Sequence, residues 1–427
     1  MGKCLRSLYD DVQRNKTRLI VIDSMFPYGN KEPFLETEIK YLVDEFDVEI
    51  FCTQLYADYP CREHKGCGLI KSPNLSSKAK RLFIEFFFSF GLFFNKSFYR
   101  ELRTLKDKKT KLLDLLVFLS CGDYLYSFLK RQLKKKHIDR DEKIIIYSYW
   151  MHTHAYVACR LKNDYKNAEI ITRCHRYDVY ENNAPHGYIP MRNYVLENED
   201  HIYCISNDAM NYLKSNYVFD FSKCHLARLG TVDLGDGAIP STFTIVSCSW
   251  MVDVKRIDRI IETLATISEE KIRWIHFGDG VLYDSLKKLS EHIPDNIMVE
   301  FAGKKTNQEV LNYYKTTGAS LFLNVSSTEG IPVSIMEAMS FGIPVVATDV
   351  GGVAEIIDGN STLLGADFDN EELKEAILKY YYMNTENYKA ARSKVRDKWQ
   401  TISNAGVNYS SFSRELLDII KVEEYDK

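Results

Sequence analysis

Short runs of apolar, β-branched residues alternate along this chain with patterns typical of helices. Turn residues bound each run, and most positions within it are apolar, as expected for parallel strands with helices on both faces. The runs are 18–23, 48–52, 143–148, 168–173 and 201–206 in the first half, and 243–248, 272–277, 297–302, 320–326 and 343–348 in the second. Helical spacing is clearest at 256–267 and 282–293. The pattern therefore predicts an α/β protein.

A segment rich in Gly, Pro and Asp interrupts this alternation at 230–242. Such composition is typical of a linker between domains. The chain has 427 residues, of which 45% are hydrophobic, and this is enough for two separate cores. We therefore predict two Rossmann-like domains, one over 1–236 and one over 237–427.

The stretch 71–136 departs from the pattern. It holds a Phe-rich run at 82–94, a basic run at 130–137, and many more Lys and Arg than Asp and Glu. One interpretation is a basic, aromatic helical surface that rests on an anionic membrane and meets a lipid-linked substrate. The alternative is a pair of amphipathic helices whose apolar face joins the core. We favour the membrane interpretation because basic charge and aromatic residues coincide.

The composition of the chain indicates where the protein is located and which partners it binds. The net charge is −3 and the sequence pI about 6.4, so no overall field attracts nucleic acid. The ten cysteines form no CxxC pair, residues 1–17 lack the apolar core of a secretory signal, and no uncharged apolar run reaches the length of a membrane span. We expect a cytoplasmic protein, located peripherally on the inner face of the membrane.

Two glutamates eight positions apart lie in the stretch 326–348. A predicted strand ends there, a turn carries Glu329, and Pro332 precedes a predicted helix at 333–341 that contains Glu337. Ligands of parallel sheets bind above the C-terminal ends of strands, and helix N-termini attract phosphate. The arrangement suits a phosphorylated ligand with hydroxyls on either side. Alternatively, the glutamates only complement the helix dipole.

The sequence of this region closely resembles the E-x7-E segment of the retaining nucleotide-sugar glycosyltransferases of family 4. These enzymes have the GT-B fold, in which two Rossmann-like domains with parallel sheets face each other. The resemblance implies that fold, with a C-terminal helix able to cross back to the first domain. Members that act in bacterial surface-polysaccharide synthesis are similar in the first half as well. The matching stretches are 327–357, 245–264, 274–280, 301–315, 26–39 and 172–180.

The resemblance assigns roles around the two glutamates. Glu337 matches the residue that binds the ribose hydroxyls of the nucleotide. Glu329 matches the residue that binds hydroxyls of the transferred sugar near its reacting carbon. Gly330, Ile331 and Pro332 are expected to bring the backbone towards the sugar and the diphosphate, although Pro332 has no N–H to donate.

Other donor contacts follow from the same resemblance. The family pairs an Arg with a Lys to neutralise the diphosphate; Lys255 matches the Lys, whereas Trp250 stands at the Arg position and Arg256 follows Lys255. We expect Lys255 and Arg256 to bind the donor. Gly278 and Gly280, in a loop after a strand, are expected near the base or ribose.

In the first half, Gly29 and Asn30 lie in a loop where related enzymes often have two glycines that let the acceptor near the diphosphate. His175, at the end of a predicted strand, matches a cleft residue that hydrogen-bonds a sugar hydroxyl or the backbone; a purely structural histidine is the alternative. No His, Cys or carboxylate spacing suggests a metal site, so we expect no metal.

Together these features predict a retaining, metal-independent glycosyltransferase without a cofactor. It would move a hexose-type sugar from a nucleotide diphosphate sugar to a hydroxyl of a glycan or lipid-linked acceptor, with Glu329, His175 and Lys255 as catalytic residues. A sugar-nucleotide epimerase of similar fold is one alternative. A non-catalytic partner subunit that binds a nucleotide sugar is another, because Trp250 departs from the family pattern.

Overall fold

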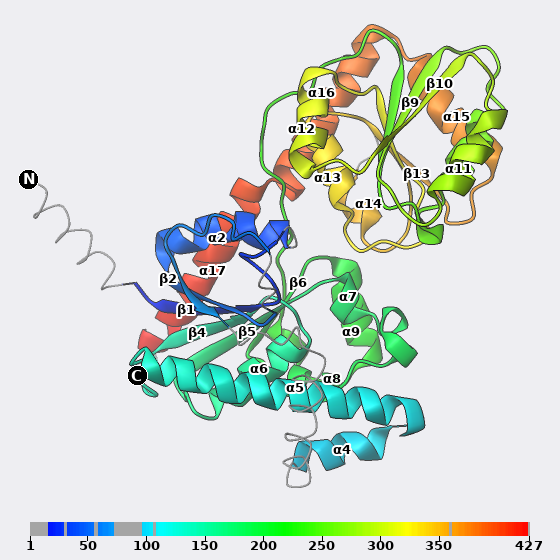
Figure 1. Cartoon of the computed structure of the whole chain (residues 1–427). Helices are drawn as coiled ribbons and strands as arrows, with labels where there is room; N and C mark the ends of the chain where they lie inside the picture. Colours follow the sequence, from blue (N-terminus) through cyan, green and yellow to red (C-terminus); the bar gives the residue numbers. More distant parts are fainter. Residues whose placement is uncertain are drawn as a thin grey trace, which may run out of the picture. The chain divides into compact units, whose positions relative to one another are not determined.

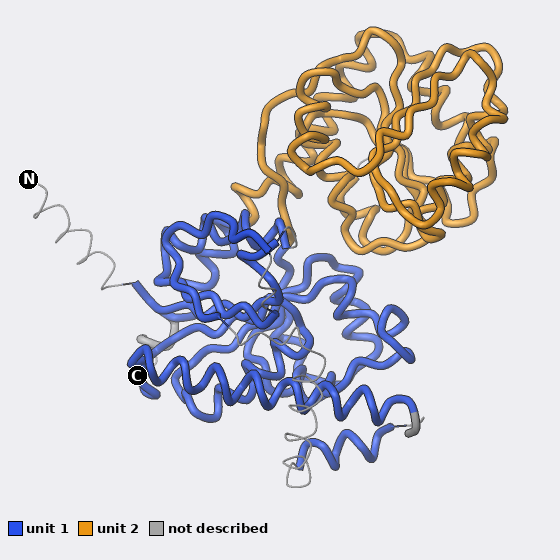
Figure 2. The backbone as a smooth tube through the Cα atoms, viewed as in Figure 1, with its two compact units in different colours: residues 1–227, 409–427 blue, residues 228–408 orange. Residues whose placement is uncertain are grey.

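The computed structural model describes residues 16–29, 32–54, 59–71, 96–105, 108–357 and 361–425. The chain forms two compact units (Figure 2). Unit 1 consists of residues 1–227 and 409–427, and unit 2 of residues 228–408. Asn30 and the Phe-rich run at 82–94 lie outside the described residues.

Unit 1 contains a seven-stranded parallel sheet in the order β3-β2-β1-β4-β5-β6-β7. All five strands predicted for the first half are present, and β3 and β7 are additional edge strands. The strands are β1 (Arg18–Asp23), β2 (Asp47–Cys52), β3 (Cys67–Lys71), β4 (Ile144–Ser148), β5 (Ala168–Cys174), β6 (His201–Cys204) and β7 (Cys224–Leu226).

Helices cover both faces of this sheet (Figure 1). Alternate residues of β1 point to opposite faces: Leu19 and Val21 join one core cluster, and Ile20 and Ile22 another. Strands buried on both sides must be apolar at nearly every position, which explains the runs in the sequence. The helices are α2 (Pro33–Glu45), α4 (Lys96–Thr104), α5 (Lys108–Lys135), α6 (Thr153–Lys162), α7 (Arg176–Val179), α8 (Arg192–Asn198), α9 (Asn207–Asn216) and α17 (Ala405–Tyr425).

One side of helix α5 joins the core of unit 1. Leu119, Leu129 and Leu133 on one side of it are fully buried. Its apolar face therefore joins the core, which was the alternative interpretation of 71–136. By length and composition alone, Thr110–Lys135 is also long and apolar enough to cross a membrane, but buried core helices pass the same test.

Unit 2 contains a six-stranded parallel sheet in the order β10-β9-β8-β11-β12-β13, and the five strands predicted for the second half are all present. The strands are β8 (Thr244–Cys248), β9 (Ile272–Phe277), β10 (Ile297–Gly303), β11 (Leu321–Asn324), β12 (Val345–Thr348) and β13 (Thr362–Leu364). The helices are α10 (Ile257–Leu264), α11 (Tyr283–Leu289), α12 (Asn307–Thr316), α13 (Val333–Ser340), α14 (Val353–Ile356), α15 (Asn370–Tyr381) and α16 (Thr385–Ile402).

The boundaries of the units differ from the predicted domains 1–236 and 237–427. Residues from 228 onwards belong to unit 2 because the backbone of Thr231 pairs with that of Asn404 and its hydroxyl accepts a hydrogen bond from Trp399 Nε1 at 2.8 Å. Residues 409–427 belong to unit 1 because one face of α17, including Phe412, is buried in the unit 1 core. The predicted second domain therefore ended too late, although a C-terminal helix shared with the first domain was expected.

Candidate functional site

The region around the two glutamates has the predicted strand, turn and helix. Strand β11 ends at Asn324, Glu329 lies on the following loop, and Glu337 lies in α13. In the sheet of unit 2, β8 and β11 are neighbours although β9 and β10 intervene in the sequence. The strand order thus reverses between β8 and β11, and parallel α/β sheets bind ligands beyond the C-terminal strand ends at such a point.

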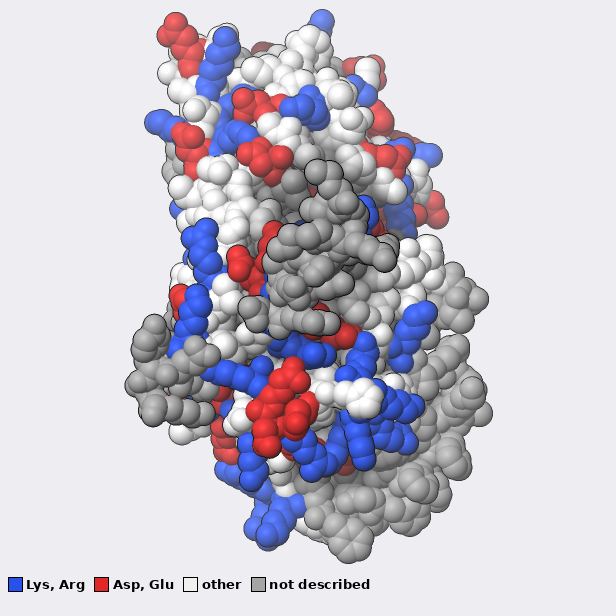
Figure 3. Space-filling view, turned by 90° about the vertical axis from the view of Figure 1, so that its left-hand side faces the viewer, with Lys and Arg blue, Asp and Glu red and all other residues white. Residues whose placement is uncertain are grey.

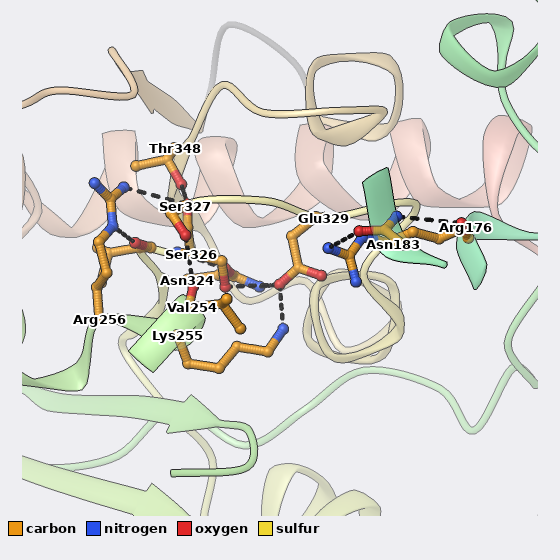
Figure 4. Close-up of polar contacts among 11 residues, drawn as sticks. Arg176, Asn183, Val254, Lys255, Arg256, Asn324, Ser326, Ser327, Glu329 and Thr348 are labelled. Atoms are coloured by element: carbon orange, nitrogen blue, oxygen red, sulfur yellow. Dashed lines mark hydrogen bonds and ion pairs between the residues drawn. The ribbon is translucent and has the colours of Figure 1, made fainter. Parts of the chain in front are cut away.

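Glu329 and Lys255 meet at this point of strand reversal (Figure 4). Lys255 comes from a short 3-10 turn after β8, and its Nζ lies 2.5 Å from Glu329 Oε1. The same oxygen accepts hydrogen bonds from Ser326 Oγ at 2.7 Å and from Asn324 Nδ2 at 3.3 Å. Two residues that are 74 positions apart are therefore held together as an ion pair.

Arg256 is engaged with the backbone of unit 2. Its guanidinium donates to the carbonyl oxygens of Val325 at 2.7 Å, Ser326 at 3.2 Å and Ala366 at 2.7 Å, and it lies over the ring of Phe368 at 5.0 Å. These contacts fix the loop that precedes Glu329. Arg256 thus has a structural role that the sequence did not reveal, and its predicted donor contact stays a prediction.

The backbone at Glu329 and Gly330 packs against a second loop. Gly351 has a φ of +56°, and a Cβ there would lie 2.1 Å from the carbonyl oxygen of Glu329. The N–H of Gly352 donates to the carbonyl of Gly330 at 3.0 Å. Only glycine allows this close approach, so Gly351 fixes the turn that carries Glu329.

Ile331 and Pro332 connect that turn to α13. Ile331 is buried, and Pro332 is the residue before the first helical residue, Val333, rather than the first residue itself. The carbonyl of Pro332 accepts the N–H of Met336 at 3.3 Å. The first N–H groups of a helix have no intrahelical acceptor, so the start of α13 is suited to an anion.

Glu337, the fifth residue of α13, is buried. Burial raises the pKa of Glu337 to about 7, against the opposing effect of a hydrogen bond that Asn307 Nδ2 donates to Oε1 at 2.5 Å. Burial and the nearby Glu337 carboxylate likewise raise the pKa of Cys248 to about 12. The Glu337 carboxyl is therefore shared between protonated and ionised forms near neutral pH.

Gly278 and Gly280 let the loops after β8 and β9 touch. A Cβ at Gly278, where φ is +152°, would lie 1.8 Å from the carbonyl oxygen of Ser249, and one at Gly280 would lie 2.5 Å from that of Met251. The packing of these two loops against each other is therefore enough to explain both glycines. Their predicted proximity to the base or ribose stays a prediction.

Trp250, which replaces the expected Arg, lies on the loop after β8 with 60% of its surface exposed. Lys304 Nζ lies over its indole ring at 5.6 Å from the centroid. An exposed aromatic ring with a cation on one face is able to stack on a planar or sugar ligand, but it cannot supply the charge of an Arg.

In unit 1, His175 directly follows β5, as predicted. Its ring lies 4.7 Å from the ring of Tyr149 and 4.5 Å from that of Trp150, measured between centroids. Its backbone N–H donates to Asp178 Oδ1 at 2.5 Å. Burial, and then the charge of Arg173, lower the pKa of His175 to about 3. The imidazole is therefore neutral at physiological pH, and its catalytic role stays a prediction.

Gly29 lies in the loop after β1 and has a φ of +68°. Its N–H donates to the carbonyl of Pro60 at 3.1 Å, and a Cβ would lie 3.2 Å from Tyr59 Cδ1. A left-handed residue in a confined place explains the glycine. Asn30, the other predicted residue of this loop, lies outside the described residues.

Several residues that shape these sites were not singled out in the sequence. Asn324 and Ser326 lie so near Glu329 in the chain that their polar side chains were a usable signal. Asn307 had none, because its partner Glu337 comes from another helix. Among the described parts of the chain, no group of three or more His, Cys, Asp or Glu side chains could hold a metal ion.

Residues 237–398 match the family model described as Glycosyl transferases group 1. The matched residues lie within unit 2. An uncharacterized glycosyltransferase of Methanocaldococcus jannaschii is 29% identical over 57% of this chain and 67% of its own length. The O-antigen biosynthesis glycosyltransferase WbnH of Escherichia coli is 32% identical, over 35% of this chain and 41% of its own.

A third relative is the putative colanic acid biosynthesis glycosyltransferase WcaL of Escherichia coli K12, 27% identical over 42% of this chain and 44% of its own length. The chain thus spans less than half the length of either E. coli relative. Among solved structures, sucrose-phosphate synthase from Thermosynechococcus elongatus has a TM-score of 0.69 at 15% identity and covers 95% of this chain and 100% of its own.

Anabaena Alr3699/HepE in complex with UDP-glucose has a TM-score of 0.61 at 13% identity, over 94% of this chain and 99% of its own. At such low identity these structures establish the fold alone. The two parallel-sheet α/β domains of this protein match GT-B glycosyltransferase structures, which confirms the predicted fold class.

Proposed function

We propose that the protein is a retaining glycosyltransferase. It moves a hexose-type sugar from a nucleotide diphosphate sugar to a hydroxyl of a glycan or lipid-linked acceptor in polysaccharide or glycoconjugate synthesis. One observation carries this proposal: the Lys255–Glu329 ion pair lies where the strand order of a group 1 glycosyl transferase domain reverses, directly before α13.

In this proposal unit 2 binds the donor. Lys255 and the first N–H groups of α13 neutralise the diphosphate, and Glu329 accepts hydrogen bonds from hydroxyls of the transferred sugar. Glu337 accepts hydrogen bonds from the ribose. The raised pKa of Glu337 fits this role. Burial separates the carboxyl from the water that would stabilise its charge, and hydrogen bonds from the ribose hydroxyls would replace that stabilisation.

The chemical step breaks the bond between the anomeric carbon and the diphosphate oxygen and forms one to the acceptor oxygen on the same face. Negative charge grows on the leaving diphosphate, and Lys255 and the α13 N–H groups stabilise it. The sugar becomes oxocarbenium-like in the transition state. A departing phosphate oxygen takes the proton of the acceptor hydroxyl, so charge and atoms balance without a metal or cofactor.

Unit 1 supplies the acceptor site, with Gly29, Asn30 and His175. The neutral imidazole of His175 hydrogen-bonds a sugar hydroxyl, or a backbone group of the protein beside the reacting centre. Names of relatives support this range of acceptors: two E. coli proteins of O-antigen and colanic acid synthesis, and a phosphatidylinositol N-acetylglucosaminyltransferase component of Arabidopsis thaliana. A lipid-linked acceptor agrees with a cytoplasmic location on the inner face of the membrane.

The basic end of α5 supports a membrane contact. Arg131, Lys134 and Lys135 are exposed there, whereas Lys130 pairs with Asp164. Figure 3 shows Lys and Arg side chains gathering on one face of unit 1, mixed with a few acidic ones. An anionic membrane surface is the complementary partner of such a face.

Thermal-shift screening with UDP-, GDP- and CDP-sugars tests donor binding, since a ligand of the folded state stabilises it. Product analysis with the stabilising donor and a panel of alkyl glycosides then tests transfer and retention. Replacing Glu329 by Ala should abolish transfer but preserve the fold. Formation of a new nucleotide sugar from donor alone would identify an epimerase instead. Donor binding without transfer or epimerisation would favour a non-catalytic role.

A further inference from the structure

A single carboxylate, that of Glu32, organises the loop after β1 in unit 1. Glu32 precedes α2 in a left-handed conformation with a φ of 58°, which is unusual for a residue other than glycine. Its Oε2 accepts the N–H groups of Met25 at 2.9 Å and Phe26 at 2.8 Å, and its Oε1 accepts that of Ser24 at 3.2 Å. Three consecutive N–H groups of the loop thus converge on one side chain.

The same carboxylate reaches a second loop. Trp150, in the loop after β4, donates its indole Nε1–H to Glu32 Oε1 at 2.6 Å. The Trp150 ring in turn lies 4.5 Å from the ring of His175, which follows β5. Glu32 therefore links the loops after β1 and β4, and through Trp150 it braces the residue after β5.

The position of this link in the sheet indicates a ligand site. The strand order of unit 1 reverses between β1 and β4, and both loops leave the C-terminal ends of these strands. Ligands of open parallel sheets bind at such a point. A left-handed residue with a buried carboxylate is unfavourable in itself, and such features are typically retained where function requires them.

The charge of Glu32 is maintained despite its burial. Burial alone would raise the pKa of Glu32, but the hydrogen bonds from Trp150 and from the N–H groups of Met25 and Phe26 outweigh it and lower the pKa. Asp23 beside it behaves oppositely: burial, together with the negative charge of Glu32, raises its pKa well above the usual value. One ionised carboxylate therefore faces the converging donors.

We propose that Glu32 is a positioning residue for the acceptor side of the reaction, which holds the loop from Ser24 to Gly29 and the Trp150–His175 pair in one arrangement. This inference rests on the proposed glycosyl transfer. The donor is bound by unit 2, so loss of Glu32 should lower turnover and leave donor affinity unchanged. Misplacing a reacting group by about 1 Å costs on the order of 100-fold in rate.

The first test measures the loop directly, in the full chain and without any ligand. In Glu32→Gln the amide replaces one acceptor oxygen, so hydrogen exchange at Ser24, Met25 and Phe26 should accelerate by on the order of tenfold or more. Glu45→Gln, at the exposed last position of α2, is the matched control and should leave exchange unchanged. Equal exchange in Glu32→Gln and the wild type overturns the proposal.

The second test measures turnover as UDP release from UDP-glucose with octyl β-D-glucoside as acceptor probe. Glu32→Gln should lower kcat by on the order of 100-fold with an unchanged KM for UDP-glucose, and Glu32→Asp should recover part of the loss. Should Glu32→Gln fail to fold, Trp150→Phe removes the indole N–H donor but keeps an aromatic ring, and should give a smaller loss of kcat. Unchanged kcat in these variants overturns the positioning role.

Failure of the proposed function and failure of the positioning role of Glu32 give different results. If no nucleotide sugar stabilises the wild-type protein, the proposed function fails, and the exchange experiment still decides whether Glu32 holds the loop. If the wild type transfers sugar and the Glu32 variants match it, only the positioning role fails.

Discussion

The Lys255–Glu329 pair allows a quantitative test of the unit 2 site. The two side chains are 22% and 10% exposed, and their charged atoms are 2.5 Å apart. An exposed pair contributes about 0–1 kcal/mol, whereas removing one partner of a buried pair costs about 3–5 kcal/mol. This pair lies between those limits, and Gln at position 329 keeps one oxygen for Ser326. We therefore expect Glu329→Gln to lower the free energy of unfolding by about 1–2 kcal/mol.

A double-mutant cycle isolates the interaction itself. Lys255→Met, Glu329→Gln and the double variant should give a coupling energy of about 1–2 kcal/mol, with the double variant losing less stability than the sum of the single ones. The assay is urea unfolding followed by tryptophan fluorescence. Three of the four tryptophans, Trp250, Trp274 and Trp399, belong to unit 2 and report its transition.

Lys305 and Glu309 form the matched control, because they are the same residue types in the same unit. Their side chains are 40% and 54% exposed and 3.9 Å apart, so their coupling should stay within about 0.5 kcal/mol. The reasoning is refuted if the coupling at 255 and 329 does not exceed the coupling at 305 and 309. The pair would then not be held in a partly desolvated site.

Three further expectations can be measured. They concern buried Glu337, Phe412 in α17 and the basic end of α5. The pKa of Glu337, raised from 4.5 to about 7, means that the folded state holds a proton that the unfolded state releases. The contribution of this group to stability is therefore greatest below pH 4.5 and falls towards pH 7 by on the order of 2–3 kcal/mol, and urea titrations of Glu337→Gln should lack this part of the pH dependence. Phe412→Ala should lower the stability of unit 1 by about 3–5 kcal/mol in calorimetry, because the ring is 2% exposed. Reversing Lys134 and Lys135 to Glu should reduce flotation with phosphatidylglycerol liposomes at least tenfold, since each Lys contributes about 1 kcal/mol.

Each of these expectations has a control at an exposed position. Glu309→Gln should keep the pH dependence, and a Glu337 variant that also keeps it would contradict the assigned protonation. Ser411→Ala, at an exposed position of unit 1 in the same helix as Phe412, should change stability by less than about 0.5 kcal/mol. Reversal of Lys65 and Lys166 should leave flotation unchanged; an equal loss there would indicate nonspecific charge instead of a defined surface.

The sequence predicted the sheets well because fully buried parallel strands leave a local record in the chain. The edge strands β3, β7 and β13 were not predicted. β7 and β13 have three residues each, which is too few to show any period. The predicted boundaries left 409–427 in the second domain, although the resemblance implied a C-terminal helix able to cross back to the first. The apolar face of α17 does not by itself reveal which core it joins. Helical spacing records burial but not the partner.

The candidate site was likewise predictable from the sequence only in part. The resemblance placed Glu329 and Lys255 in one site, and the neighbouring strands β8 and β11 explain why they meet. The carbonyl contacts of Arg256 and the loop held by Glu32 depend on atoms from distant elements. No spacing along the chain encodes such contacts, so they became visible only in three dimensions.

Unit 1 is formed by two separate segments of the chain, and this has a consequence for its synthesis. Residues 409–425 leave the ribosome only after all of unit 2, so the core residues that pack with Phe412, Leu416 and Ile420 stay uncovered while some 180 further residues are made. The nascent first unit therefore offers a temporary binding surface for chaperones. A stop codon before residue 409 would leave that surface permanently uncovered and favour aggregation, even though every predicted site residue would still be translated.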